Sequence, residues 1–312
     1  MPDLDMIDRN ALFGGSASSS PWVRRPIRIW FTDWWIPFDP ADNIFTFMLQ
    51  QRYEVVLDKH YPEILFFSAF SENHRGYRNA FKIFVTGENV RPPMDLCNLA
   101  LSFDHLHHDR HRRLPLHVIH MFNFFRAGLI PHFLHLAGPR DIPTSDQWLD
   151  RRFCCFVYSN PNCEMRNRFF TLLNERKRVD AAGRVLNNTG YLVKLDWWSK
   201  IRFLSQYRFC ISFENSSHSG YTTEKLSDSL LAGCIPIYWG NPDVFLDYNP
   251  EAFVGLRTGE SLDALVDRVL ELEASVDSCR EILMQRRMTE EHFRWYDLAA
   301  VRDWIVEGFE AA

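Results

Sequence analysis

The sequence predicts an α/β protein with two domains, each built on a parallel sheet that helices cover. Strongly apolar runs of strand length recur along the chain, and each ends in a polar loop. Segments with apolar residues at helical spacing lie between these runs, and strands that alternate with helices form parallel sheets. At 312 residues the chain exceeds the usual size of a single hydrophobic core, which favours two domains.

The first predicted domain covers residues 26–145 and follows a tail, residues 1–25, that is acidic and then rich in glycine and serine. It begins with RPIRIWFTDWW, a β-rich run that ends in a polar break. EILFFSAF and FKIFVTGEN repeat this pattern, and residues 44–53 between the first two runs are amphipathic. A segment with proline and glycine, AGPRDIPTSDQW, then indicates a boundary at residues 137–148.

The pattern restarts in the second predicted domain, residues 146–290. RRFCCFVYSN and YRFCISFEN are predicted strands, and MRNRFFTLLNERKR between them is a predicted helix. TEKLSDSLLAG predicts a helix closed by Gly233, and CIPIYWG predicts the next strand. Helical spacing continues over residues 261–287 and 291–309, so the chain is predicted to end in helices, the last over residues 291–312.

Composition and motifs exclude several classes of protein. Apolar residues make up 46% of the chain and charged residues 24%, as in a globular protein, and a formal charge of −5 argues against general nucleic-acid binding. The seven cysteines show neither metal nor disulfide spacing, so we expect reduced thiols and a cytoplasmic protein. There is no dinucleotide fingerprint, phosphate loop or nucleophile elbow.

Neither a membrane span nor a metal site is predicted. The longest apolar-rich region, residues 114–136, contains four histidines, Arg126 and Pro131, which a membrane-spanning helix would not tolerate well. Peripheral contact with the inner face of a membrane stays open. Histidines gather in FDHLHHDRHRRLPLH without a compact set of cysteine or glutamate ligands, so a packed or solvated histidine face is favoured over zinc: His105, His107, His108 and His111.

VTGEN, residues 85–89, presents a carboxylate where a buried strand leaves the sheet. Glu88 follows Gly87 at this point, a position suited to a general base with a partly desolvated side chain. The simpler alternative is a turn carboxylate that caps the next segment, because carboxylates at strand ends are common.

FENSSHSGYTTEKL is a long polar stretch held between two apolar runs, and it predicts a binding loop. A helix that starts near Thr223 would offer free N–H groups and a positive dipole end to an anion, with Lys225 adding a point charge. The carboxylate of Glu224 could accept hydrogen bonds from vicinal sugar hydroxyls, while Tyr221 and Asn215 offer a ring edge and an amide. The alternative is a capped amphipathic helix with a solvated Glu–Lys pair.

YSNPNCEMRNRFF places a turn and a helix start directly after a predicted strand. Arg166 falls in the first turn of that helix, and a guanidinium group can clamp a diphosphate through paired N–H donors. Arg168 is the competing choice, and a surface arginine without a ligand is the alternative for either residue.

Taken together, FENSSHSGYTTEKLSDSLLAGCIPIYWG, VTGENVRP upstream and FVYSNPNCEMRN between them resemble the α-1,3-fucosyltransferases, especially the bacterial members. The similarity runs from RIWFTDWW to about Tyr248 and includes LSFDHLHHDRHRRLPL. The resemblance implies a GT-B architecture: two Rossmann-like domains that face an interdomain cleft, with C-terminal helices. It assigns the acceptor sugar to the first domain and GDP-fucose to the second.

The resemblance also implies roles for single residues. Transfer would invert the anomeric carbon of fucose, with Glu88 as the base that deprotonates the acceptor hydroxyl. Cations and a helix end can stabilise the departing diphosphate, so we expect neither a metal nor a cofactor beyond the GDP-fucose donor. The donor site would comprise Arg166 and Lys225 at the diphosphate, Asn215, Tyr221 and Glu224 at the ribose, phosphates or fucose, and Ser159 and Asn160 beneath the nucleotide.

The expected acceptor is a glycan of the N-acetyllactosamine or lactose type, with galactose or N-acetylglucosamine. Trp34 and Trp35 are candidate stacking surfaces for this sugar, although both could equally belong to the core. Two alternatives remain: a related transferase that uses another nucleotide sugar, and a binding protein for sugar nucleotides or glycans without chemistry. A pure binding protein has no use for a base, so the combination of Glu88 and the donor cluster favours an enzyme.

Overall fold

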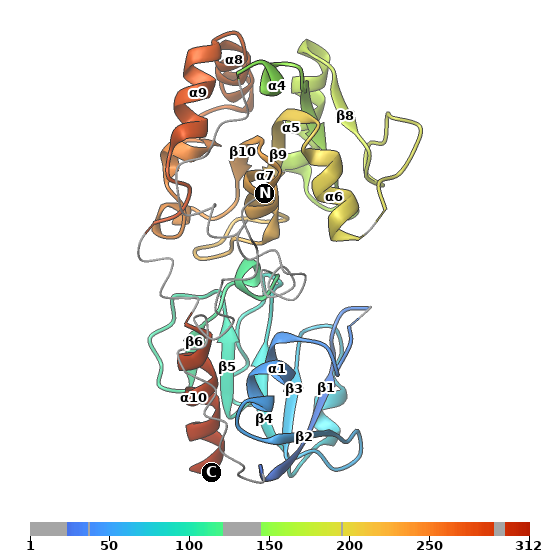
Figure 1. Cartoon of the computed structure of the whole chain (residues 1–312), viewed down its shortest axis with the longest axis vertical. Helices are drawn as coiled ribbons and strands as arrows, with labels where there is room; N and C mark the ends of the chain where they lie inside the picture. Colours follow the sequence, from blue (N-terminus) through green and yellow to red (C-terminus); the bar gives the residue numbers. More distant parts are fainter. Residues whose placement is uncertain (1–23, 37, 121–144, 195, 290–296) are drawn as a thin grey trace, which may run out of the picture. The chain divides into compact units, whose positions relative to one another are not determined.

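The computed structural model consists of two α/β units, shown in Figure 1. The first unit contains residues 1–131 and 293–312, and the second contains residues 132–292. The predicted tail up to residue 23, most of the predicted boundary segment and the start of the predicted last helix lie outside the described residues. The structure describes residues 24–36, 38–120, 145–194, 196–289 and 297–312.

The first unit is built on a six-stranded sheet in which every strand pairing is parallel. The predicted strand runs form its centre. Nearly all side chains of the second and third runs are buried, on both faces of the sheet, whereas buried and more exposed side chains alternate along the first run. Strands of three or four residues complete both sides of this sheet. The strand order is β2 (Glu54–Leu57), β1 (Pro26–Thr32), β3 (Ile64–Phe67), β4 (Phe81–Val85), β5 (Leu99–Ser102) and β6 (His111–Arg113).

Helices α1 (Ile44–Gln50) and α10 (Leu298–Glu310), which lie far apart in the sequence, pack together in this unit. Helix α1 begins after Asn43, whose side chain caps its first turn. Helix α10 packs beside it, and the Tyr53 hydroxyl group donates a 2.7 Å hydrogen bond to Glu310. The last helix of the sequence is therefore part of the first unit, as its position beside β5 and β6 in Figure 1 also shows.

The second unit contains a five-stranded sheet that is also entirely parallel. The predicted strands RFCCF, YRFCISF and IPIYW form its three central strands. The strand order is β11 (Val254–Gly255), β10 (Ile235–Trp239), β9 (Tyr207–Phe213), β7 (Arg152–Phe156) and β8 (Val179–Ala181).

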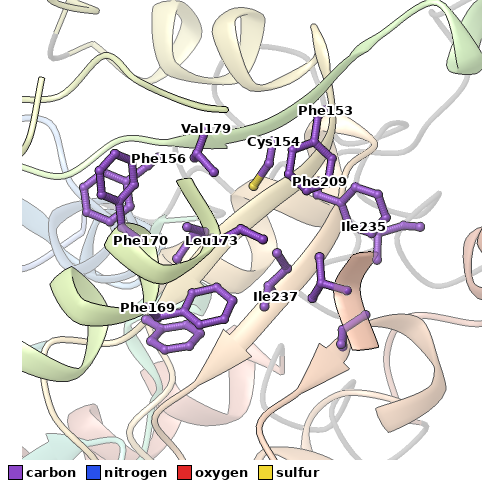
Figure 2. Packing of buried hydrophobic residues seen from close by; sticks show 14 of the residues in the cluster. Phe153, Cys154, Phe156, Phe169, Phe170, Leu173, Val179, Phe209, Ile235 and Ile237 are labelled. Atoms are coloured by element: carbon purple, nitrogen blue, oxygen red, sulfur yellow. The ribbon is translucent and has the colours of Figure 1, made fainter. Parts of the chain in front are cut away.

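Helices cover both faces of this second sheet. Successive strand residues point to opposite faces, so Cys154 joins one apolar cluster and Cys155 the other. Residues from α5, α8 and α9 pack in the first cluster, and Figure 2 shows Phe169, Phe170 and Leu173 of α5 within it. Phe169 stacks on Phe213 with ring centroids 4.9 Å apart. Residues from α6 and the end of α7 pack in the second. The helices are α4 (Ser145–Leu149), α5 (Glu164–Arg176), α6 (Trp197–Leu204), α7 (Glu224–Ala232), α8 (Leu262–Glu273) and α9 (Val276–Met284).

Several local predictions are confirmed in detail. Helix α7 ends at Gly233, whose φ of 83° is the left-handed conformation that glycine adopts without strain. The helical spacing over residues 261–287 is realised as two helices, because Ser275 caps the start of α9. Short 3₁₀ turns complete the architecture: η3 (Asn73–Gly76), η4 (Val244–Leu246) and η5 (Pro250–Ala252). Within the described ranges, no helix has the length and apolar character needed to cross a membrane.

Candidate functional site

The polar loop between β9 and α7 lies at the carboxyl edge of the second sheet, where open α/β sheets bind ligands. Helix α7 begins as predicted, with Thr223 as its N-cap residue. The loop is held by hydrogen bonds from Gly220 N–H to Asn241 Oδ1 (2.8 Å) and from Asn241 Nδ2 to Thr222 Oγ1 (3.0 Å). A loop that follows β10 therefore fixes the loop that follows β9.

Glu214 is the buried centre of this loop, and the sequence analysis missed it. Its side chain has no exposed surface, and its carboxylate accepts hydrogen bonds from Thr223 N–H (2.7 Å) and Thr223 Oγ1 (2.7 Å). The Lys225 ammonium group lies 3.1 Å from the same carboxylate. Burial raises the pKa of Glu214, and the positive charge of Lys225 opposes the shift. The sequence pattern that indicated Glu88, a carboxylate soon after a buried strand, also holds for Glu214 and could have identified it.

Lys225 is held in place by its neighbours. Its side chain is only 13% exposed, and Nζ also donates to Thr223 Oγ1 at 2.8 Å. The predicted partner Glu224 lies farther away, at 3.8 Å. The alternative of a solvated Glu224–Lys225 pair is therefore wrong, because Lys225 pairs mainly with a carboxylate inside the protein.

Glu224 belongs to a second, linked set of charges. Lys200 on α6 approaches Glu224 to 3.8 Å and forms a 2.7 Å ion pair with Asp228, one turn farther along α7. Trp197 donates a 3.0 Å hydrogen bond to the same Asp228. The sequence analysis also missed Lys200, since nothing in a helical repeat shows which other helix its charge will meet.

Arg166 is buried completely, in the first turn of α5. Its Nη1 donates a 2.7 Å hydrogen bond to Asn215 Oδ1, and its Nη2 donates to the backbone carbonyl of Asn160. The guanidinium group also lies over the Tyr158 ring, 4.0 Å from the centroid. The alternative of a solvated surface arginine is therefore wrong for Arg166, whereas Arg168 is exposed. A direct contact with a diphosphate stays a prediction.

The structure thus joins three of the seven predicted donor residues, Arg166, Asn215 and Lys225, through one dipeptide, Glu214–Asn215. Glu214 binds Lys225 and Asn215 binds Arg166, so two cationic groups from α7 and α5 are fixed beside the carboxyl ends of β9 and β7. The remaining predicted residues differ in exposure: Tyr221 is buried, whereas Ser159 and Asn160 are exposed.

Glu88 lies in the first unit, in the loop that follows β4. Its N–H donates a 3.0 Å hydrogen bond to Thr86 Oγ1, and its carbonyl oxygen accepts one from Val90 N–H (2.7 Å). A Cβ atom at Gly87 would lie 2.5 Å from a Leu116 methyl group, which explains the glycine. Glu88 itself is exposed, so the partial desolvation expected from the sequence is not found.

A pocket of about 680 Å³ opens beside the two predicted acceptor tryptophans, also within the first unit. The Trp34 ring stacks on Phe38 with centroids 4.3 Å apart, and its Nε1 donates a 3.3 Å hydrogen bond to Phe66 O. Trp35 makes T-shaped contacts with Phe38 and Phe70 and a tilted contact with Trp34, and none of its ring contacts is stacked. Trp34 is therefore partly a packing residue, and Trp35 is the better candidate for a ligand surface. Polar groups in the lining come from Thr32, Asp33, Lys59, Asn73 and Tyr77.

Asp33 fixes the loop that carries these tryptophans. It adopts a φ of 62°, and its buried carboxylate accepts hydrogen bonds from Asn73 N–H (2.9 Å) and His74 N–H (3.0 Å). Burial alone would raise the pKa of Asp33, but hydrogen bonds from Ser71 and His74 outweigh it and lower the pKa below 3.8. The stability that these bonds provide is present above pH 3.8 and is lost as the pH falls below it.

Replacing Asp33 with asparagine should therefore make the free energy of unfolding depend less on pH in the acid range. Asparagine tolerates the left-handed conformation but has only one acceptor oxygen, so we expect a loss of about 1–2 kcal/mol at neutral pH. The difference from the unsubstituted protein should be constant from about pH 7 to about pH 5 and should shrink as the pH then falls through 3.8 to about 2, because protonation weakens the carboxylate's hydrogen bonds. Urea unfolding across this range measures it. A constant difference would contradict this role of the carboxylate.

Within the described part of the chain, no group of three or more histidine, cysteine, aspartate or glutamate side chains is arranged to hold a metal ion. The predicted histidine run is partly built into the fold: His111 is buried and contacts Ser102 Oγ (2.9 Å), whereas His105, His107 and His108 are exposed. All seven cysteines lie in the described ranges, and each is buried and free of a disulfide.

Two family descriptions match this chain. Residues 29–120 match the α-(1,3)-fucosyltransferase FucT N-terminal domain, and residues 150–304 match the C-terminal part of glycosyltransferase family 10 (fucosyltransferase). Among individual relatives, α-(1,3)-fucosyltransferase FucT from Helicobacter pylori is 31% identical over 91% of this chain and 64% of its own length. GDP-fucose protein O-fucosyltransferase 3 from Danio rerio is 27% identical over 54% of this chain and 35% of its own length. The chain thus spans less than two thirds of these relatives.

Solved structures give the same assignment over a larger share of the chain. A crystal structure of α1,3-fucosyltransferase is 28% identical and aligns with a TM-score of 0.76 over 95% of this chain and 92% of its own. A structure of α1,3-fucosyltransferase with GDP-fucose is 27% identical and also aligns with a TM-score of 0.76, over 95% and 93%. The HepE structure from Anabaena, with a TM-score of 0.51 at 7% identity, is similar in fold alone.

Proposed function

Because this chain belongs to glycosyltransferase family 10, the fucosyltransferases, we propose that it transfers L-fucose from GDP-fucose to a hydroxyl group of a glycan. The proposed product carries an α-1,3 linkage, and the proposed acceptor is an N-acetyllactosamine or lactose unit. The name of the Helicobacter pylori relative supports this linkage, and the structure of a relative with GDP-fucose supports this donor.

One observation carries the proposal: the Glu214–Asn215 dipeptide fixes Lys225 and Arg166 at the carboxyl edge of the second sheet. A nucleoside diphosphate needs positive charge and N–H donors of this kind, and the start of α7 supplies both beside the loop. Glu224, in the same turn, is the proposed acceptor of hydrogen bonds from the hydroxyl groups of a ribose.

Glu88 supplies the proposed base. In a direct displacement that inverts the anomeric carbon, a carboxylate takes the proton of the attacking hydroxyl while the diphosphate leaves from the opposite face. The exposed position of Glu88 at the end of β4 suits a substrate that arrives from solvent. Cations stabilise the leaving diphosphate in this mechanism, so we propose turnover without a divalent metal.

A product assay tests the proposal. The protein is incubated with GDP-fucose and a small set of acceptors, with and without EDTA, and products are identified by mass spectrometry and linkage analysis. We expect a fucosylated lactose or N-acetyllactosamine at similar rates in both conditions. Transfer from another nucleotide sugar in a parallel donor panel, with none from GDP-fucose, would contradict the donor. Binding of GDP-fucose without any product would favour a non-catalytic protein.

Trp35 tests the acceptor part of the proposal. Its exchange for alanine removes an aromatic face beside the pocket, so we expect the KM for the acceptor to rise about tenfold with a small change in kcat. Tyr61→Ala is a matched control, since Tyr61 is an aromatic residue of the same unit that is 74% exposed and absent from the pocket lining. Equal kinetics for the two variants would remove Trp35 from the acceptor site.

The cytoplasmic location predicted from the cysteines stays a prediction, as does peripheral contact with a membrane. Cell fractionation of the tagged chain tests both: we expect it in the soluble fraction or, if peripheral, released from membranes by high salt.

A further inference from the structure

The side chain of Glu214 is fully buried, and a buried carboxylate strongly destabilises the folded protein unless it accepts hydrogen bonds from several donors. Three donors compensate for this burial: Thr223 N–H and Thr223 Oγ1, each at 2.7 Å, and Lys225 Nζ at 3.1 Å. All three come from the first turn of α7 or its cap, so one carboxylate organises the start of that helix.

The surrounding chain leaves room for this side chain. Gly240 follows β10 with a φ of 152°, and a Cβ atom there would lie 2.4 Å from Glu214 Cγ. Glu214 N–H donates a 2.8 Å hydrogen bond to Trp239 O, which ties the residue to the neighbouring strand. The end of β10 is thus shaped around Glu214.

The buried carboxylate restrains the Lys225 side chain and changes the role of Thr223, the N-cap residue. The Thr223 side chain does not cap the helix, because Oγ1 donates to Glu214 and accepts from Lys225 Nζ (2.8 Å). A lysine side chain normally samples many rotamers, and two anchors remove much of this freedom. An ammonium group has three hydrogens, so two anchors leave one for an oxygen atom of a ligand.

We propose that Glu214 is a positioning residue for the donor diphosphate: directly and through the Thr223 hydroxyl group, it holds the Lys225 ammonium group in the geometry that binds the phosphate oxygens. This inference rests on the proposed function, and it assigns Glu214 no contact with the substrate. A structural role alone would affect folding, whereas positioning through Lys225 makes the effect on donor binding depend on Lys225.

A double-mutant cycle on donor binding tests the inference. Calorimetry gives the Kd for GDP-fucose of the full chain and of Glu214→Gln, Lys225→Met and the double variant. Glutamine keeps the shape of the side chain but loses its charge, so we expect the Kd to rise about tenfold in the otherwise unchanged protein. In the Lys225→Met background the same exchange should change the Kd less than about twofold.

Glu273→Gln is the matched control. Glu273 is also a largely buried carboxylate, and it forms ion pairs with Lys177 (2.7 Å) and Arg208. Lys177 directly follows α5 and Arg208 lies at the start of β9, so this cluster is at the amino edge of the same sheet. We expect its Kd to stay within about twofold of the unsubstituted protein, because it lies away from the carboxyl edge. Thermal unfolding of each variant shows that the compared proteins are folded.

A second variant covers the case in which Glu214→Gln does not fold. Thr223→Val keeps the carboxylate and the N–H group but removes the hydroxyl anchor of Lys225, and we expect the Kd to rise about threefold to fivefold. An equal effect of Glu214→Gln in both backgrounds, or unchanged Kd values for Glu214→Gln and Thr223→Val, would overturn the inference. If the unsubstituted protein binds neither GDP nor GDP-fucose, the proposed function itself fails, which is a separate outcome.

Discussion

Replacing Glu88 with glutamine should lower the rate of fucose transfer by about 10²-fold or more while GDP-fucose binding is retained. Glutamine has the size and polarity of glutamate but cannot take a proton from the acceptor hydroxyl. The loop should keep its shape, because its hydrogen bonds join the backbone of Glu88 to the Thr86 hydroxyl group and do not use the Glu88 side chain. Initial rates at saturating acceptor, together with calorimetric donor binding, separate chemistry from binding.

Glu54→Gln is the control for this experiment. Glu54 is an exposed carboxylate of the same unit, but it begins β2 at the amino end of the sheet, whereas Glu88 follows the carboxyl end of β4. We expect its rate to stay within about twofold of the unsubstituted protein. Near-normal turnover of the Glu88 variant would remove this residue from the role of base, whatever the family of the chain.

Replacing Arg166 with alanine should lower the free energy of unfolding by about 3 kcal/mol and also weaken donor binding. The exchange removes the hydrogen bond to Asn215 and the contact with the Tyr158 ring, and it leaves a cavity where a fully buried side chain was. Asn215 then loses the partner that orients its amide in the loop between β9 and α7. Urea unfolding and calorimetry with GDP-fucose measure the two effects.

Arg168→Ala is a close control, since it changes the same residue type two positions along α5. Arg168 is exposed, so we expect a change in stability within about 0.5 kcal/mol and an unchanged donor affinity. Similar losses for the two variants would show that helix α5, and not the buried guanidinium group, accounts for the result.

The candidate site could be predicted from the sequence only in part. The strand-end loops around Glu88, Asn160 and Asn215 were recognisable because polar residues directly follow buried apolar runs. The surface arginine and the solvated Glu–Lys pair were reasonable alternatives, because spacing along a helix does not reveal how deep a side chain lies. Burial of Arg166 and Lys225 is set by packing from other elements.

Local pattern therefore determined the existence and order of the principal elements: alternation of apolar runs and helical segments specifies parallel strands, and Gly233 specifies the end of α7. Only the tertiary structure decided that Glu214 organises the loop between β9 and α7 and that α10 belongs to the first unit. Hydrogen bonds within a helix or turn join residues close in sequence, so sequence pattern can indicate them. Contacts such as Tyr53 with Glu310 join distant residues, and they form only when the whole chain has packed.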